Sequence, residues 1–164
     1  MGDLSSLLLI TLLFFLLICS GCFSGTETAL FSLNRIERRR LTQDKAVRSQ
    51  LIARALRRPR ELLSTILFGN TLINVATSAV ATLLFQRLVS EHSLASAIVV
   101  DSLLVLFIGE IIPKTIAVNQ AMPLSRAAIM PLRFFARFSR PVVRIFDLLA
   151  RGLLKVLKVP EETG

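Results

Sequence analysis

Three long apolar runs constrain this chain more than any other feature, because each is long enough to cross a lipid bilayer. They cover residues 4–33, 62–86 and 94–118. A helix needs about 20 apolar residues to span the hydrocarbon core, and lipid admits only elements whose backbone groups are satisfied internally. The sequence therefore predicts an all-α membrane protein with three transmembrane helices per protomer.

The basic residues are separated from these runs. Of the 20 Lys and Arg residues, ten lie between the first and second runs, one lies between the second and third, and nine follow, counting Lys114. Basic loops stay in the cytosol during membrane insertion. We therefore expect a multi-pass protein of the cell (inner) membrane, with the N-terminus outside and the C-terminus in the cytosol.

Residues 35–58 and 124–158 mix basic and apolar residues at helical spacing. Such segments lie flat at the membrane surface, so we expect amphipathic juxtamembrane helices that form a belt on the cytosolic side, the second broken near Pro141. A basic stretch also suggests nucleic acid, but its place between two spans favours membrane lipid, and we expect no nucleic-acid partner. Residues 1–159 then form one transmembrane domain and 160–164 a tail.

The third apolar run contains the residues that most clearly suggest a site. Gly109, Glu110, Pro113 and Lys114 interrupt it. Ionisable side chains at membrane depth are costly and usually functional, and Pro113 removes a backbone donor. We predict that the helix is broken over these residues, that the carbonyl of Gly109 is freed, and that the broken segment lines a site.

The first two runs carry polar residues at a matching depth. Ser20, Ser24 and Glu27 fall on one helix face beside a predicted Ser-Gly kink, and Asn70 and Asn74 lie one turn apart. At ~1.5 Å per residue, these groups and the carboxylate of the third run reach the cytosolic half of the bilayer. An all-oxygen ligand set suits Mg²⁺ or Ca²⁺ rather than zinc or copper.

Each of these residues also has a plainer interpretation. Serine and glycine are common packing residues between membrane helices, and asparagines hydrogen-bond across them. Glu110 and Lys114, at i and i+4, could form a simple ion pair. Their coincidence at one depth favours a cation site, and ligand type alone does not separate magnesium from calcium.

Three motifs, SGCFSGTETALFSLNR (20–35), LLSTILFGNTLINV (62–75) and GEIIPKTIA (109–117), occur in this order. Together they resemble the transmembrane domain of the CorC/cyclin M (CNNM) magnesium transporter family. The resemblance implies a homodimer that exports Mg²⁺, coupled to Na⁺ entry, and cytosolic regulatory domains, among them a CBS module that binds ATP. It also implies that a dehydrated Mg²⁺ is bound by residues from all three motifs, namely Ser20, Ser24, Asn70, Asn74, Gly109 through its carbonyl, and Glu110, with Glu27, Pro113 and Lys114 nearby or involved in coupling.

Two rival functions remain open. A cation channel would conduct without sodium coupling, and a membrane anchor or sensor domain would use its polar residues only to hold helices together. An enzyme is not expected: Ser24 has no histidine at a matching depth, and no metalloprotease motif occurs.

Overall fold

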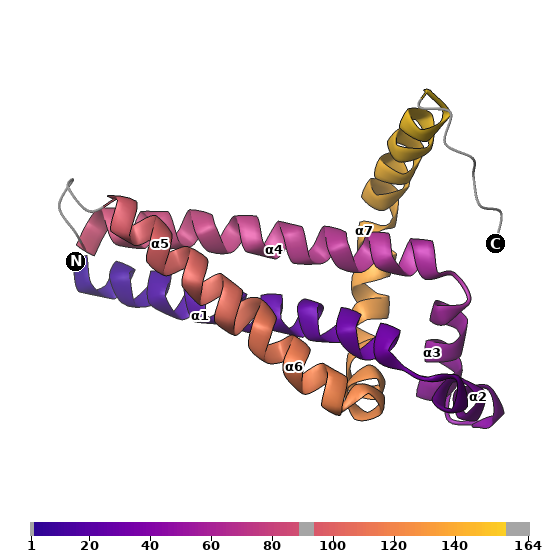
Figure 1. The fold of residues 1–164 in the computed structure, drawn as a ribbon. Helices are drawn as coiled ribbons and strands as arrows, with labels where there is room; N and C mark the ends of the chain where they lie inside the picture. The colour runs from indigo at the N-terminus through magenta and orange to yellow at the C-terminus, as the bar shows by residue number, and fades with distance from the viewer. Residues whose placement is uncertain (1, 89–93, 157–164) are drawn as a thin grey trace.

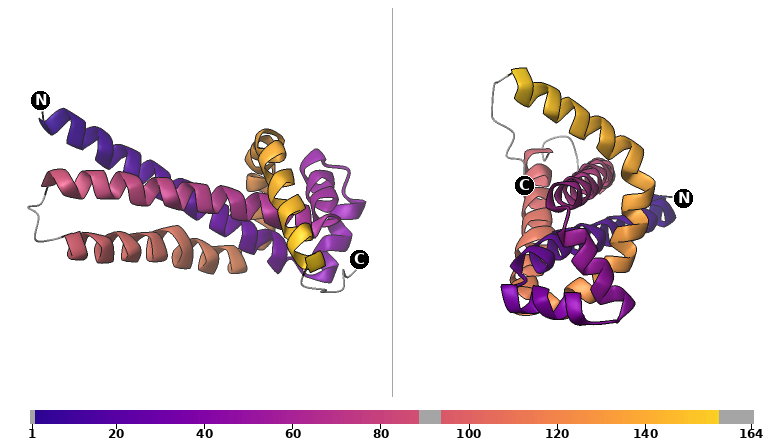
Figure 2. Two further views of the ribbon diagram at one scale, coloured as in Figure 1. Left: turned by 90° about the horizontal axis from the view of Figure 1, so that it is seen from above. Right: turned by 90° about the vertical axis from the view of Figure 1, so that its right-hand side faces the viewer.

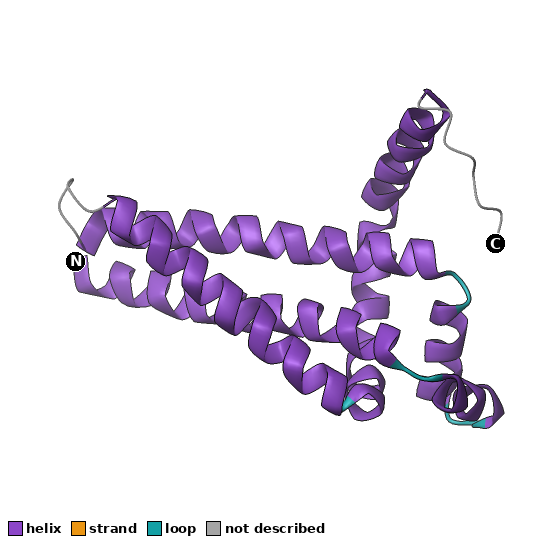
Figure 3. Cartoon of the chain, in the orientation of Figure 1, coloured by secondary structure: helices purple, strands orange, loops and turns teal. Residues whose placement is uncertain are grey.

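The computed structural model describes residues 2–88 and 94–156, and every regular element within them is a helix (Figures 1 and 3). In chain order these are α1 (Gly2–Ser32), α2 (Arg35–Gln43), α3 (Val47–Leu56), α4 (Pro59–Leu88), α5 (Leu94–Leu104), the π-helix η2 (Val105–Ile111), α6 (Ile112–Asn119) and α7 (Ala121–Val156). The all-α prediction is confirmed. The tail 160–164 and the end of the stretch 124–158 lie outside the described residues.

Three helical rods run side by side along most of the molecule, namely α1, α4 and the uninterrupted series α5–η2–α6 (Figures 1 and 2). Among the described residues, Leu4–Ser32 and Pro59–Arg87 are long and apolar enough to cross a membrane, with mean hydropathies of 2.6 and 1.5. The third rod consists of three shorter elements, none of which alone reaches spanning length. The third span therefore stays a prediction.

The kink predicted in the first run does not form a break, because α1 continues unbroken through its Ser-Gly segment. Gly21 serves close packing instead. A Cβ atom on Gly21 would lie 2.9 Å from Pro113 Cγ, whereas one on Gly25 would make only ordinary contacts with Pro113, at 3.5 Å. Small residues let α6 approach α1 in the way common between membrane helices.

The break predicted over 109–114 is also replaced by a continuous helix with one widened turn. The η2 segment begins earlier than expected, at Val105, and the N–H of Ile112 bonds the carbonyl of Phe107, five residues back. In an α-helix the ring of Pro113 would meet the carbonyl four residues before it. A π-helical turn makes room for the ring, so the helix continues through the proline.

Short helices cross the end of the three rods that lies near Ser32 and Pro59 (Figure 2). The basic stretch 35–58 forms two helices, α2 and α3. A capping box starts α2: the N–H of Glu37 donates to Asn34 Oδ1 at 2.8 Å, and the N–H of Asn34 donates to Glu37 Oε2 at 2.9 Å. Such reciprocal bonds satisfy two backbone donors that a helix start leaves open.

The turn between α2 and α3 is tied to α7 through one carboxylate. Asp44 accepts hydrogen bonds from the Ala46 N–H at 2.9 Å, from Ser49 Oγ at 2.7 Å and from Arg126 Nη2 at 3.1 Å. These donors hold the pKa of the Asp44 carboxyl below its ordinary value, the Ala46 N–H contributing most. Asp44 therefore fixes how the crossing helices pack on one another.

The helix α7 is one element, although we expected two helices broken near Pro141. Pro131 and Pro141 both lie inside it, and α7 changes direction along its length (Figure 2). A proline removes one backbone bond and bends a helix without having to end it. Phe134 and Phe138 project from α7 and are 78% and 83% exposed, as expected of an amphipathic helix.

Two apolar cores hold the rods together. The larger lies where the crossing helices meet the rods and comprises Leu30, Leu33, Leu41, Leu51, Ile52, Leu62, Ile66, Ala121, Ile129 and Leu132. The smaller joins α1 to α4 near their other ends and comprises Leu13, Leu17, Ala81 and Leu84. Many large apolar side chains on the outer faces of the rods are exposed, which is the surface expected of helices surrounded by lipid.

An aromatic contact joins α1, α4 and α7 beside Gly69. The rings of Phe23 and Phe135 meet edge to face with their centroids 4.9 Å apart. A Cβ atom on Gly69 would overlap the ring of Phe23 and lie 2.9 Å from Phe135 Cε1. Glycine is therefore needed at position 69 for the two rings to pack against α4.

We expect Gly69→Ala to lower the melting temperature of the purified protein. Overpacking costs about 1–3 kcal/mol, which exceeds the gain of about 1 kcal/mol from replacing a helical glycine by alanine. The control is Gly25→Ala, whose Cβ would make only ordinary contacts of 3.5 Å. Equal melting temperatures for both variants would contradict the tight packing at Gly69.

We expect the stabilising effect of Asp44 to disappear at low pH. Because the folded pKa is lowered, the stabilisation is fully present above the unfolded value of about 3.8 and is lost as the pH falls through the folded value. Melting temperatures of wild type and Asp44→Asn should therefore differ at pH 6 and converge in acid. A difference that persists unchanged well below the folded pKa would refute this role of the carboxylate.

Candidate functional site

Three side-chain oxygens meet where α1 packs on α4. Ser20 is fully buried, and its Oγ lies 2.6 Å from Asn74 Oδ1 and 3.5 Å from Asn70 Oδ1. A serine hydroxyl has one hydrogen to donate, and the short distance assigns that hydrogen to Asn74. The amide oxygen of Asn70 faces the same hydroxyl at a distance too long for a good hydrogen bond.

The backbone of the third rod closes this cluster. A Cβ atom on Gly109 would lie 2.9 Å from Ser20 Oγ, so the backbone at position 109 packs directly on the serine. Gly109 is buried and belongs to the π-helical turn η2. Pro113 has no N–H to offer the carbonyls one turn before it, and the carbonyl oxygen of Ile108, in the same turn, lies 3.3 Å from the position of a Cβ atom on Gly21.

Ser24 lies one turn further along α1 and is also fully buried. Within residues 2–88 and 94–156, its hydroxyl has no hydrogen-bond partner. Buried hydroxyls in proteins are normally bonded, and serine in a helix can bond the carbonyl four residues back. Among the described residues, the hydroxyl of Ser24 makes neither kind of bond.

Glu110 directly follows Gly109, so its carboxylate is the nearest one along the chain to the polar cluster. Its side chain is only partly buried, being 33% exposed, and Glu110 Oε2 lies 3.8 Å from Lys114 Nζ. At 3.8 Å the pair is longer than a hydrogen bond, so Lys114 does not fully satisfy the Glu110 carboxylate.

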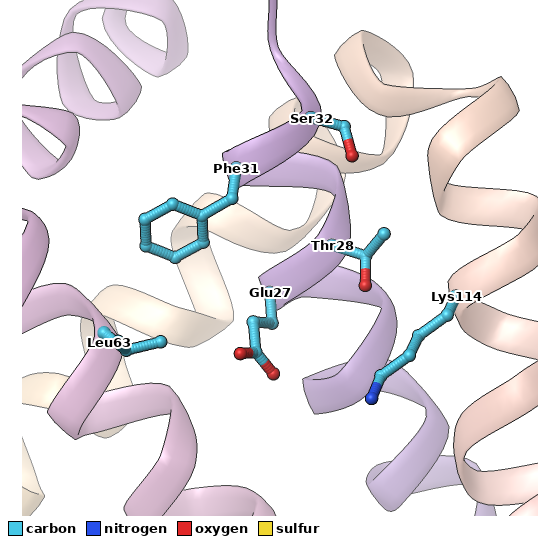
Figure 4. A pocket seen from close by; sticks show the side chains of 6 residues that line it. All are labelled: Glu27, Thr28, Phe31, Ser32, Leu63 and Lys114. Carbon is cyan, nitrogen blue, oxygen red and sulfur yellow. The ribbon is translucent and has the colours of Figure 1, made fainter.

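Glu27 and Lys114 line a separate pocket of about 490 Å³ between α1, α4 and α6, together with Thr28, Phe31, Ser32 and Leu63 (Figure 4). In Figure 4 the carboxylate of Glu27 and the amine of Lys114 both extend into the space between the helices. This pocket lies about two turns from Ser20 along α1, toward the end where the basic helices cross. The carboxylate of Glu27 and the amine of Lys114 therefore lie between the polar cluster and the end of the rods where the basic helices cross.

The structure thus brings together four of the residues singled out in the sequence, namely Ser20, Asn70, Asn74 and Gly109. Ser24 is buried one turn along α1, whereas Glu110 and Glu27 form no hydrogen bond or ion pair with these four residues in the described part of the chain. Pro113 acts in packing against Gly21. In the part of the chain that the structure describes, no group of three or more His, Cys, Asp and Glu residues could hold a metal. The oxygens that the structure does bring together here belong to a hydroxyl and two amides.

The sequence reasoning missed the residues that support this cluster. Gly69 directly precedes Asn70, and its packing with Phe23 and Phe135 holds α4 in position. The Asn34-x-x-Glu37 pattern is a recognisable capping signal at the start of α2. The contact between Gly69 and Phe135 has no such local signal, because the two residues are far apart in the sequence.

Comparison with known proteins identifies the family to which this chain belongs. A family model described as the cyclin M transmembrane N-terminal domain (CNNM) matches residues 11–164. A UPF0053 protein of Haemophilus influenzae is 32% identical over 157 residues, which make up 94% of this chain and 37% of that protein. The UPF0053 inner membrane protein YfjD of Escherichia coli is 29% identical over 140 residues, or 85% of this chain and 33% of that protein.

A DUF21 domain-containing chloroplastic protein of Arabidopsis thaliana is 31% identical over 139 residues, which cover 84% of this chain and 21% of that protein. The chain therefore spans 21–37% of the length of these relatives. The family model covers nearly all of the chain, and two of its helices are long and apolar enough to span a membrane. The chain belongs to the cyclin M (CNNM) family and is a membrane-embedded domain of that family.

Proposed function

We propose that this domain binds Mg²⁺ as its transported ion and moves it across the membrane. The observation that carries the proposal is the convergence of Ser20, Asn70 and Asn74 oxygens on the backbone at Gly109. Magnesium is a hard cation that prefers oxygen ligands in a small octahedral arrangement. The unpaired hydroxyl of Ser24 adds a further ligand one turn away.

Charge compensation for the ion comes from Glu110 in this proposal. The carboxylate leaves Lys114, which it contacts only at 3.8 Å, and turns toward the ion that occupies the adjacent cluster. The partial exposure of Glu110 in a single chain is compatible with a homodimer in which a second copy covers this face. Family membership supports a transporter over an enzyme.

The transport cycle that we propose exports Mg²⁺ and is coupled to Na⁺ entry. In it, the series α5–η2–α6 crosses the membrane as the third span, with the N-terminus outside. Among the described basic residues, Arg87 is the one at the end of the rods where α1 begins, and the others lie toward the end where the short helices cross. This distribution supports the orientation, because basic segments stay in the cytosol. Cytosolic domains that bind ATP would act on the crossing helices.

Two alternatives would make different use of the same cluster. A cation channel would pass Mg²⁺ without a sodium gradient and at a far higher rate. A membrane anchor or sensor would keep Ser20, Asn70 and Asn74 only as hydrogen-bonding contacts between helices, which is a common use of such residues.

We expect Asn74→Ala and Glu110→Ala each to weaken Mg²⁺ binding at least tenfold in calorimetry on the purified protein, because each removes an oxygen ligand. The control is Thr82→Ala on α4, which removes an exposed hydroxyl bonded only to its own helix. Calcium and sodium serve as competing ions. Wild-type binding in both site variants, with normal melting temperatures, would refute the site.

We expect Mg²⁺ flux in proteoliposomes to require an opposing Na⁺ gradient. The variant Glu27→Gln should weaken the sodium dependence, because it removes the carboxylate from the pocket beside Lys114. Fast flux without sodium would favour the channel, and Mg²⁺ binding without flux would favour the anchor or sensor.

A further inference from the structure

A basic pocket on α2 is not explained by ion transport. Arg35, Ile36, Arg38, Arg39 and Thr42 line a surface pocket of about 600 Å³. The spacing of the three arginines and the threonine, at i, i+3, i+4 and i+7, places them on one face of the helix. Leu41, on the other side of α2, is buried in the larger apolar core, so this arginine face is directed outward.

The positive charge of this face is not neutralised within the described part of the chain. There, the side chains of Arg35 and Arg39 make no hydrogen bond or ion pair, and Arg38 donates only to the carbonyl of Leu33, at 3.0 Å. The neighbouring carboxylates are engaged elsewhere: Glu37 caps the helix start, and Asp44 binds Ser49 and Arg126. Three guanidinium groups at one pocket therefore lack an anion.

The pocket also includes one exposed apolar side chain, that of Ile36, close in the sequence to the apolar surface of α1. Ile36 is 66% exposed beside the arginines. The helix α2 follows α1 after two residues and lies across the end of the rods (Figures 1 and 2). The exposed apolar side chains of α1 extend to Phe31. The arginines and Ile36 thus directly follow the exposed apolar surface of α1 along the chain.

We propose that this pocket on α2 binds the headgroup of an anionic membrane phospholipid. Arg35 and Arg39 bind the phosphate oxygens through paired N–H donors, an arrangement that the planar guanidinium favours. Ile36 contacts the first methylene groups of the acyl chains. A soluble phosphate ion would gain nothing from Ile36, so the combination of charges and apolar surface favours the lipid. The proposal rests on this end of the rods being at the cytosolic membrane surface, but not on ion transport.

The test is native mass spectrometry of the full chain released from detergent that contains equal amounts of phosphatidylglycerol and phosphatidylcholine. We expect the wild type to retain phosphatidylglycerol preferentially. Arg35→Gln/Arg39→Gln should weaken retention about tenfold or more, because each substitution removes paired, charge-assisted N–H donors from the phosphate. Arg48→Gln/Arg54→Gln on α3 is the matched control, because it removes the same charge from two exposed side chains, and it should change retention less than twofold.

Three results would overturn the proposal. The first is an equal loss of lipid in the two double variants, which would indicate diffuse attraction to the whole basic surface. The second is no preference for phosphatidylglycerol in the wild type. The third is displacement of the lipid by millimolar inorganic phosphate. Arg35→Lys/Arg39→Lys keeps the charge and the helix but not the paired donors, so an intermediate loss in this variant supports binding by the guanidinium groups. Because none of these measurements uses Mg²⁺, their failure would leave the proposed transport function intact.

Discussion

The close approach of α1 to the third rod is the constraint on which the rest of the structure depends. Gly21 lies against Pro113 and Ser20 lies against Gly109, and a single added carbon at either glycine would come within 2.9 Å of its neighbour. The widened turn η2 lets the third rod keep its helical bonds while Pro113 packs into α1. A glycine, a proline and a π-helical turn together set the distance between Ser20 on α1 and the backbone of the third rod at Gly109.

The polar cluster brings two acceptors to one hydroxyl. Ser20 has one hydrogen to donate, and the amide oxygens of Asn74 and Asn70 both face it. Groups of this kind are costly in an apolar environment unless they find partners. The two amide oxygens that meet at Ser20 are the feature on which the proposed cation site rests, and the same groups also serve as contacts between helices.

Much of this arrangement follows from local sequence. The apolar runs 4–33 and 62–86 match α1 and α4 to within three residues at each end, because length and hydropathy alone define such helices. The depth of Ser20, Asn70 and Asn74 follows from helical rise. The unbroken course of α1 and the π-helical turn do not follow, because each depends on how Pro113 fits a neighbouring helix. The link from Asp44 to Arg126 joins residues 82 positions apart and has no local signature.

The ring of Phe135 has a consequence for how distant parts of the protein can communicate. It extends from α7 onto Phe23 and the surface of α4 at Gly69, immediately beside Asn70. A Cβ atom on Gly69 would meet both rings, so the rings leave no free space against α4 at this point. A shift of α7 that moves Phe135 would therefore reach α4 next to Asn70, and the position of α7 is coupled in this way to the geometry of the polar cluster.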